Sequence, residues 1–186
     1  VTVSDKISMN PDSEIEILGK MGENFLILKF KDQQPELYIM DAGLKIKSQQ
    51  TLRQRDPEEH ILTASIFNDT LYTISARSQA RGFLLLLSRY DDQVRLMSPD
   101  TLAMSDNRFD LHDFQIVTDE TSRYIVLYRF TRGNRLELWP IDLQKRIMMT
   151  SKAIIYSEKF DPDLLLDLQL STRATLTFSY GADFRG

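Results

Sequence analysis

The sequence predicts an all-β, β-propeller-like protein, built from four-stranded antiparallel meanders that repeat about every 50 residues. Apolar and polar residues alternate in short runs separated by turn residues, and this period of two is typical of strands. The runs fall into groups of four. An aspartate follows the third run of each full group, as Asp41, Asp91 and Asp142, at intervals of 50 and 51 residues. Together these observations favour a series of propeller blades over a helical fold.

The first repeat covers residues 10–52 and contains four runs of alternating apolar residues. Gly22 and Gly43 mark two of its turns, and Pro35 marks the third. Short turns between consecutive strands produce an antiparallel meander. The predicted strands are Glu14–Gly19, Asn24–Phe30, Glu36–Asp41 and Leu44–Leu52.

The same order returns twice, over residues 60–102 and 112–155. Val, Ile, Leu, Phe and Tyr dominate these runs, as expected for strands. The predicted strands of the second repeat are His60–Phe67, Leu71–Ser75, Phe83–Tyr90 and Val94–Leu102. Those of the third repeat are His112–Thr118, Arg123–Phe130, Arg135–Ile141 and Lys145–Ile155.

A partial fourth repeat, residues 164–186, holds two predicted strands, Leu164–Leu170 and Ala174–Tyr180. Asp161-Pro162-Asp163 has the residues of a helix start, but its place in the repeat favours a strand after it. Residues 1–9 are interpreted as an additional outer strand. We interpret residues 1–186 as a single propeller-like domain.

Three repeats and part of a fourth do not determine whether the blades close into a ring. The chain fits either a fragment of a larger propeller or a small ring of four blades. An open array of meanders and a β-sandwich are the alternatives to a propeller, although a sandwich has no strict fourfold strand repeat. A fragment would expose a blade face or edge, so self-association is expected in that case.

The turns support the repeat. Each of the three aspartates is followed by a basic residue four positions on and an aliphatic residue five positions on. An aspartate that opens a turn can accept hydrogen bonds from backbone N–H groups of that turn. Asn68-Asp69-Thr70 matches a glycosylation pattern, but Asn-Asp also suits a tight hairpin turn, and we favour the turn.

Composition argues against several classes of function. The net charge of −4 and a pI near 5.2 argue against a nucleic-acid partner. The chain has no cysteine, which excludes disulfides, thiolate catalysis and cysteine metal sites. Its longest strongly apolar run, Phe83–Leu87, is too short to span a bilayer. Because the chain starts at Val1, we expect that a leader or an upstream domain precedes it.

Glu14–Gly19 followed by Asn24–Leu28 opens a pattern of strand, turn and strand, which Leu37–Asp41 with Leu44-Lys45 continues and Asp113–Ile116 takes up again. This pattern resembles the blades of a group of uncharacterised proteins from Bacteroidetes-type bacteria. The resemblance implies an exported envelope protein, located in the periplasm, at the cell surface or outside the cell. It also implies a propeller-like domain with no assigned activity, and it carries over no functional residue.

Residues that carry chemistry are sparse. A nucleophilic triad needs a histidine beside a carboxylate and a nucleophile, but His60 and His112 both begin predicted first strands and are interpreted as strand-entry residues. Asp110, His112 and Asp113 cluster in one loop without the spacing of a calcium loop. No phosphate loop, dinucleotide fingerprint, zinc motif or serine elbow occurs. We therefore expect no cofactor and no metal, and an enzyme is disfavoured.

Charged residues divide between the turns. Turns that join first to second and third to fourth strands are acidic, and in a propeller they lie opposite the connections between second and third strands. Those connections are interpreted as basic, through Lys29, Lys31, Arg77, Arg81, Arg129, Arg132 and Arg135. Long links between blades share the basic face and bring acids to it, and such loops commonly carry recognition. Charges that only keep the protein soluble are the alternative. The candidate binding residues are Arg77, Arg81, Arg132, Arg135, Asp110, His112 and Asp113.

The leading hypothesis is a non-enzymatic binding or scaffold module that recognises a protein or glycan partner through this loop face. One alternative is a carbohydrate- or peptide-active hydrolase or lyase, in which His112 acts beside Asp110, Asp113 or Asp163. Another is a structural part of a larger envelope protein that associates through a blade edge. Trp139 is expected to pack between neighbouring blades rather than to anchor a partner.

Overall fold

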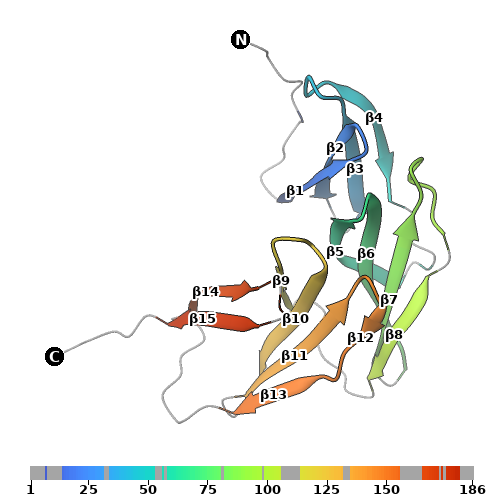
Figure 1. Ribbon diagram of the computed structural model, residues 1–186. Helices are drawn as coiled ribbons and strands as arrows, with labels where there is room; N and C mark the ends of the chain where they lie inside the picture. The colour runs from blue at the N-terminus through green and yellow to red at the C-terminus, as the bar shows by residue number, and fades with distance from the viewer. Residues whose placement is uncertain are drawn as a thin grey trace. The chain divides into compact units, whose positions relative to one another are not determined.

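The computed structural model contains only strands and turns in the part of the chain that it describes (Figure 1). None of these residues forms a helix that could span a membrane. The all-β fold class is therefore confirmed. The described residues are 14–31, 34–52, 59–80, 82–97, 99–105, 114–131, 135–155, 165–171 and 175–180, with Ile7, Asp56, Glu58 and Arg173.

The first two sheets are four-stranded antiparallel meanders, in which each strand pairs with the next in the chain. The first sheet consists of β1 (Glu14–Met21), β2 (Asn24–Lys31), β3 (Gln34–Met40) and β4 (Ile46–Thr51). The second sheet consists of β5 (Glu59–Phe67), β6 (Thr70–Ser78), β7 (Phe83–Tyr90) and β8 (Asp100–Ser105).

The third sheet repeats this meander, and a hairpin follows it. The third sheet consists of β9 (Gln115–Thr118), β10 (Tyr124–Thr131), β11 (Arg135–Asp142), β12 (Ile147–Met148) and β13 (Lys152–Ile155), of which the last two both pair with β11. The hairpin is β14 (Leu165–Leu170) with β15 (Leu176–Tyr180). Three meanders and a partial fourth confirm the predicted repeat of propeller-like sheets.

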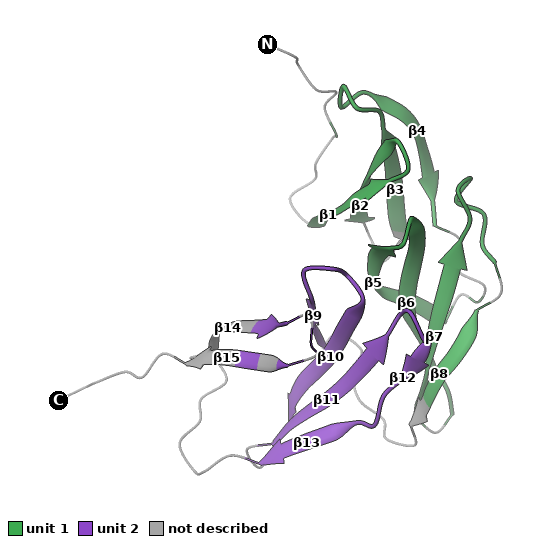
Figure 2. Ribbon diagram, in the orientation of Figure 1, with its two compact units in different colours: residues 1–108 green, residues 109–186 purple. Residues whose placement is uncertain are grey.

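The chain divides into two compact units, residues 1–108 and 109–186 (Figure 2). Unit 1 contains the first and second sheets, and unit 2 contains the third sheet and the hairpin. Each unit has an apolar core of its own. The assignment of residues 1–186 to a single domain stays a prediction.

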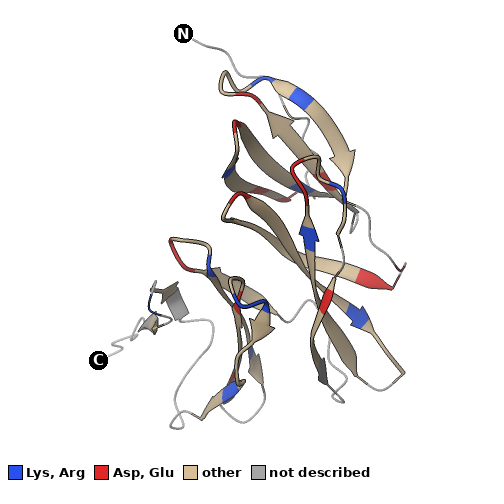
Figure 3. Cartoon of the chain, turned by 45° about the vertical axis from the view of Figure 1, so that its right-hand side comes forward, with Lys and Arg blue, Asp and Glu red and all other residues tan. Residues whose placement is uncertain are grey.

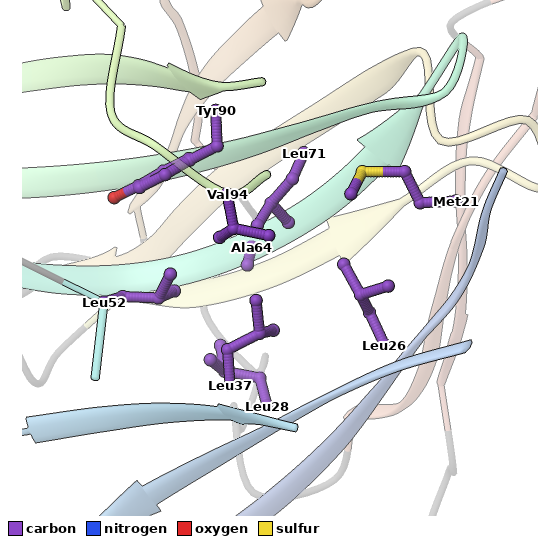
Figure 4. Packing of buried hydrophobic residues seen from close by; sticks show 9 residues of the cluster. All are labelled: Met21, Leu26, Leu28, Leu37, Leu52, Ala64, Leu71, Tyr90 and Val94. Carbon is purple, nitrogen blue, oxygen red and sulfur yellow. The ribbon is translucent and has the colours of Figure 1, made fainter. Parts of the chain in front are cut away.

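In unit 1 the core lies between the two sheets. Leu26 and Leu28 on β2 and Leu37 on β3 point to one side of the first sheet and pack against Ala64 and Leu71 of the second. Figure 4 shows these side chains converging from both sheets. Leucines at alternate positions on neighbouring strands give the sheet an apolar patch on one face, and burial of this patch stabilises the stack.

The core of unit 2 follows the same rule. Val126 and Tyr128 on β10, with Leu136 and Leu138 on β11, share one face of the third sheet. They pack with Leu170, which ends the first strand of the hairpin. The sheet therefore uses the positions that the first sheet uses for its own core.

The outer strands depart from the predicted boundaries. Lys145–Ile155 was expected to be one strand, but it is broken into β12 and β13. Pro140 on β11 lies opposite the break and has no N–H to donate, although its carbonyl accepts from Met149. The outer strand of the second sheet, predicted at Val94–Leu102, is also displaced. Leu96 forms an isolated bridge to Tyr90, and the regular strand runs from Asp100, after Pro99, to Ser105.

The turns confirm the predicted chemistry. Oδ1 of Asp41 accepts the backbone N–H groups of Gly43 and Lys45, at 2.8 and 2.9 Å. Asp91 and Asp142 do the same in their own turns. The third turn is one residue longer, because Met148 rather than Ile147 pairs with the residue before the aspartate.

Asn68 and Asp69 form the tight hairpin turn that their sequence predicted. Both have left-handed backbone angles, with φ of 48° and 54°, and Phe67 pairs directly with Thr70. Left-handed angles at two central residues are the mark of a hairpin turn that matches strand twist. The outer strand expected in residues 1–9 and the alternative helix start at Asp161–Asp163 lie outside the described residues, except for Ile7.

Candidate functional site

The structure describes two of the seven candidate binding residues, Arg77 and Arg135. The other five lie outside the described residues, as does Asp163: Arg81, Arg132, Asp110, His112 and Asp113. His60 is half-buried at the start of β5, as its interpretation as a strand-entry residue requires. Recognition through the long loops therefore stays a prediction.

Arg77, near the end of β6, is paired with an acid of the link before β5. Its Nη1 lies 3.4 Å from Oδ2 of Asp56. Two residues earlier on the same strand, the buried hydroxyl of Ser75 donates to the buried carboxylate of Glu59. At this end of the second sheet, Arg77 and Ser75 are therefore each paired with a carboxylate.

Arg135 also faces a carboxylate, which it shares with a second arginine. Nε of Arg135 lies 3.2 Å from Oε1 of Glu137, while Nε and Nη2 of Arg129 donate to Oε2 at 2.9 and 2.7 Å. Trp139 lies beside this group, with its ring 5.5 Å from the Arg129 guanidinium and 5.1 Å from the ring of Phe114. Within unit 2, Trp139 is therefore a half-buried packing residue.

The first sheet has the same arrangement. Lys29 lies opposite Glu36 across β2 and β3, as Arg129 lies opposite Glu137 across β10 and β11. Nζ of Lys29 is 3.8 Å from Oε2 of Glu36, which also accepts the hydroxyl of Tyr38.

Placing Lys29 and Arg129 in connections between strands was wrong, because both belong to strands, are buried and face a glutamate on the next strand. The period-two pattern hid them, because each occupies a polar position within an otherwise apolar run. Four cations of this set have side chains that the structure describes, and each lies within ion-pair distance of a carboxylate: Lys29, Arg77, Arg129 and Arg135.

Acidic residues lie in several turns, coloured red in Figure 3, and the turn aspartates accept hydrogen bonds from the backbone of their own turns. The backbone N–H of Arg95 and then its side chain hold the pKa of Asp91 below the ordinary carboxyl value. Burial acts to raise the pKa of Asp142, but hydrogen bonds from Arg123 and the backbone of Lys145 outweigh it and lower the pKa. These carboxylates hold the turns together.

A groove with a volume of about 470 Å³ lies within unit 1, between the two sheets. One wall comes from the end of β4 and the residue after it, and the other from the end of β7 and the turn that follows. The lining residues are Gln50, Thr51, Leu52, Tyr90, Gln93, Val94, Arg95 and Leu96. Sites of a few hundred Å³ commonly hold ligands or partner side chains.

The floor of the groove is apolar and its rim is rich in donors. Leu52, Tyr90 and Val94 are buried and belong to the core between the sheets (Figure 4). In the described part of the chain, Nε2 of Gln50 is buried and has no hydrogen-bond partner. Arg95 is 70% exposed at the rim, where it pairs with Asp91. The groove can therefore bind a ligand that places an apolar group on the floor and a hydrogen-bond acceptor at the rim.

Glu16 on β1 is a second unusual residue. Burial, followed by the charge of neighbouring Glu14, raises the pKa of Glu16 to about 7, although a hydrogen bond from Thr63 on β5 acts in the opposite direction. A carboxyl that titrates near neutrality can serve as an acid or base. Among the described residues, however, no group of three His, Cys, Asp or Glu side chains is placed to hold a metal ion.

Sequence reasoning missed both features. The walls of the groove are separated by about forty residues, and they meet only because two sheets stack. One signal was available: Val94 and Leu96 are apolar at a turn where solvent would favour polar residues. Glu16 occupies a position opposite buried Leu28, which only the strand register reveals.

Comparison with known proteins gives weak structural likenesses. No protein-family model and no curated protein matches the chain. Hydrazine synthase from Kuenenia stuttgartiensis is 11% identical with a TM-score of 0.47, over 88% of this chain and 42% of that one. The Nup133 β-propeller domain from Vanderwaltozyma polyspora is 12% identical with a TM-score of 0.44, over 73% and 45%.

A third likeness is to prolyl oligopeptidase B from Galerina marginata, which is 11% identical with a TM-score of 0.42, over 88% of this chain and 22% of that one. The chain spans less than half the length of each of these three structures. Likenesses of this strength assign no activity, ligand or partner.

Proposed function

We propose that this chain is a non-enzymatic binding module that holds an extended segment of a protein partner in the groove of unit 1. The observation that carries the proposal is the pairing of an apolar floor with the buried, unpartnered Nε2 of Gln50 among the described residues. A buried donor without an acceptor costs free energy that a bound acceptor would recover.

The shape of the groove favours a peptide over a glycan. Tyr90 is only 3% exposed, so its ring offers no free face on which a sugar could stack. An apolar side chain of a partner would instead contact half-buried Leu96, which lines the groove beside Val94. The partner's main-chain carbonyl groups would accept hydrogen bonds from Gln93 and Arg95 at the rim, and from the buried Nε2 of Gln50 after its side chain turns into the groove.

The neighbouring strand supports the same mode of binding. In the described sheet β4 is a terminal strand, paired only with β3. Lys47, Ser48, Gln49 and Thr51 on it are exposed. Polar, exposed edges resist random aggregation but can still accept an added strand.

The loop-face residues remain a second part of this proposal, because the long links could extend the contact. Export to the periplasm, the cell surface or the medium is likewise proposed, on the resemblance to envelope proteins alone. Neither part is needed for the groove to bind a peptide.

The test uses a displayed library of random short peptides, selected on the whole chain. Selected peptides are then measured against two variants, Gln93→Arg and Gln144→Arg. Gln93 and Gln144 occupy the same position in equivalent turns, where each backbone N–H donates to the turn aspartate, but only Gln93 lines this groove. We expect Gln93→Arg to weaken binding about tenfold or more, and Gln144→Arg to change it less than about twofold.

Three outcomes would contradict the proposal. The library could yield no binder, or its binders could lose affinity equally in both variants. An oligosaccharide array could also give ligands that depend on Gln93 where the peptides do not, which would identify the groove as a glycan site.

A further inference from the structure

The backbone of β4 has an unpaired edge beside the groove. The N–H of Leu52, the residue after β4, donates to the carbonyl of Pro35 on β3 at 2.9 Å. Because hydrogen-bonding directions alternate along a strand, Gln50 also points its N–H and C=O toward β3, whereas Gln49 and Thr51 point theirs away. In the part of the sheet that the structure describes, β4 pairs only with β3, so these outward groups of Gln49 and Thr51 have no strand partner there.

The side chains of β4 alternate between the two faces of the sheet. Gln50 lies directly opposite Leu37, whose side chain is fully buried between the two sheets. The side chain of Gln50 therefore shares that face, where the groove lies, and those of Gln49 and Thr51 are on the other face. In a strand added beside β4, the residue next to Gln50 would direct its side chain into the groove.

The groove begins where the first sheet ends. One of its walls is the end of β4, and the other is the chain segment that follows β7 in the second sheet. On that segment Val94 is buried, and Leu96 is half-buried and packs against the core between the sheets. A strand added to β4 would turn the same face toward the second sheet as the strands already stacked there. The contact would therefore continue an interface that unit 1 already contains.

From this we infer that the partner segment binds as an added strand on β4, an inference that rests on the proposed function of the groove. The main chain of the segment pairs with Gln49 and Thr51, and one apolar side chain enters the groove beside Gln50. In complexes of this kind, main-chain hydrogen bonds give affinity and pockets for alternate side chains give specificity. The added strand is antiparallel to β4, the pairing used throughout this sheet and the more stable one per residue.

The edge of β4 also limits the length and sequence of the segment. The register shifts between Ile39 and Met40 of β3, which leaves exposed Lys47 without a residue opposite. Bulges and lysines interrupt strand addition at sheet edges, so regular pairing is confined to residues 48–52. The partner is therefore a short extended segment with an apolar residue between two residues that pair through their N–H groups. Proline has no N–H and is excluded from those two positions.

The first test compares two proline variants of the whole chain, Thr51→Pro and Ala153→Pro, in binding to a library-selected peptide. Thr51 lies opposite Glu36 in the first sheet, and Ala153 on β13 lies opposite Glu137 in the third. Both residues are exposed on strands that end their described sheets, where proline is tolerated, but only Thr51 lines the groove. Thr51→Pro should weaken binding about tenfold or more, and Ala153→Pro less than about twofold. Far-UV circular dichroism checks that both variants are folded.

N-methylation of the selected peptide tests the same hydrogen bonds without altering the protein. Each N-methyl group removes one main-chain donor, and in an antiparallel pair only every second N–H of the peptide points toward β4. We expect N-methylation to weaken binding about tenfold at alternate residues. Alanine substitution should weaken binding most at the residue between them, whose side chain occupies the groove.

The outcomes separate this inference from the proposal on which it rests. Peptides that lose affinity in Gln93→Arg, but bind Thr51→Pro normally and show no alternation on N-methylation, would overturn the added strand and leave the groove proposal standing. A library that yields no binder would overturn both. If light scattering shows a dimer of the chain that Thr51→Pro abolishes, the edge of β4 belongs to a second copy and the inference is wrong.

Discussion

Arg129 and Glu137 face each other in register across β10 and β11, and two nitrogens of the guanidinium donate to one carboxylate oxygen at 2.9 and 2.7 Å. Side-chain exposures of 10% and 15% place this pair largely out of water. Lys29 and Glu36 occupy the same positions in the first sheet. The first and third sheets therefore share a cross-strand charge pair as well as strands and turns, whereas Ser75 and Leu86 occupy these positions in the second sheet.

Removal of Glu137 is expected to be costly, because it leaves Arg129 buried without its carboxylate. Glu137→Ala should lower the free energy of unfolding by about 3 kcal/mol or more. Arg135→Ala should cost less than about 1 kcal/mol, since Arg135 is 49% exposed. Urea denaturation measures both. Similar effects for the two variants would show that Arg129 does not depend on this pair.

Glu16 should make stability fall as pH rises. Its pKa of about 7 in the folded chain exceeds the ordinary 4.5, so the folded state holds a proton that the unfolded state releases between these values. Stability from the neutral carboxyl is complete below about pH 4.5 and lost through pH 7. Glu16→Gln should remove this slope and stabilise the chain near pH 8 by on the order of 2 kcal/mol. Denaturation curves at both ends of this pH range test the prediction, and parallel pH profiles of stability for the unchanged chain and Glu16→Gln would contradict it.

Asp142 should act in the opposite direction. Its pKa is lowered, so its contribution is present above the ordinary value of 3.8 and is lost as pH falls below that value. Asp142→Asn breaks the ion pair with Arg123 at 3.1 Å and should cost about 2 kcal/mol at neutral pH. Asp41→Asn should cost less, because Asp41 is only half-buried. Thermal unfolding at neutral and acidic pH compares them, and an unchanged acid midpoint in Asp142→Asn would count against this role.

The hairpin turn at Asn68 should tolerate glycine and reject a β-branched residue. Its φ of 48° is left-handed, which glycine adopts freely and valine does not. Asn68→Val should lower the free energy of unfolding by roughly 1–2 kcal/mol, whereas Asn68→Gly should leave it within about 0.5 kcal/mol. Chemical denaturation distinguishes them. Equal stability of the valine and glycine variants would mean that the turn can change its type.

Much of the fold could be predicted because its signals are local. Alternation of apolar residues fixed the strands of the first sheet to within a few residues, and Asp41, Asp91 and Asp142 marked equivalent turns. Pro140 illustrates the limit of local signals. The break it imposes falls on the partner strand, and only the pairing of β11 with β12 and β13 reveals it.

The candidate site was less predictable because it depends on contacts distant in sequence. Gln50 and Gln93 line one groove only after two sheets stack. The sequence pattern placed Lys29 and Arg129 in hairpin connections, whereas the strand register places each of them opposite a glutamate. The five loop residues outside the described part of the chain, His112 among them, stay predictions.

The most direct test of the binding proposal is hydrogen exchange of the whole chain with and without a peptide selected from the library. We expect slower exchange at residues 50–52 and 93–96, which line the groove, and no change at residues 142–147, the equivalent turn of the third sheet. Protection at Arg77 and Arg135 with an unchanged groove would contradict the account and move the binding surface to the loop face.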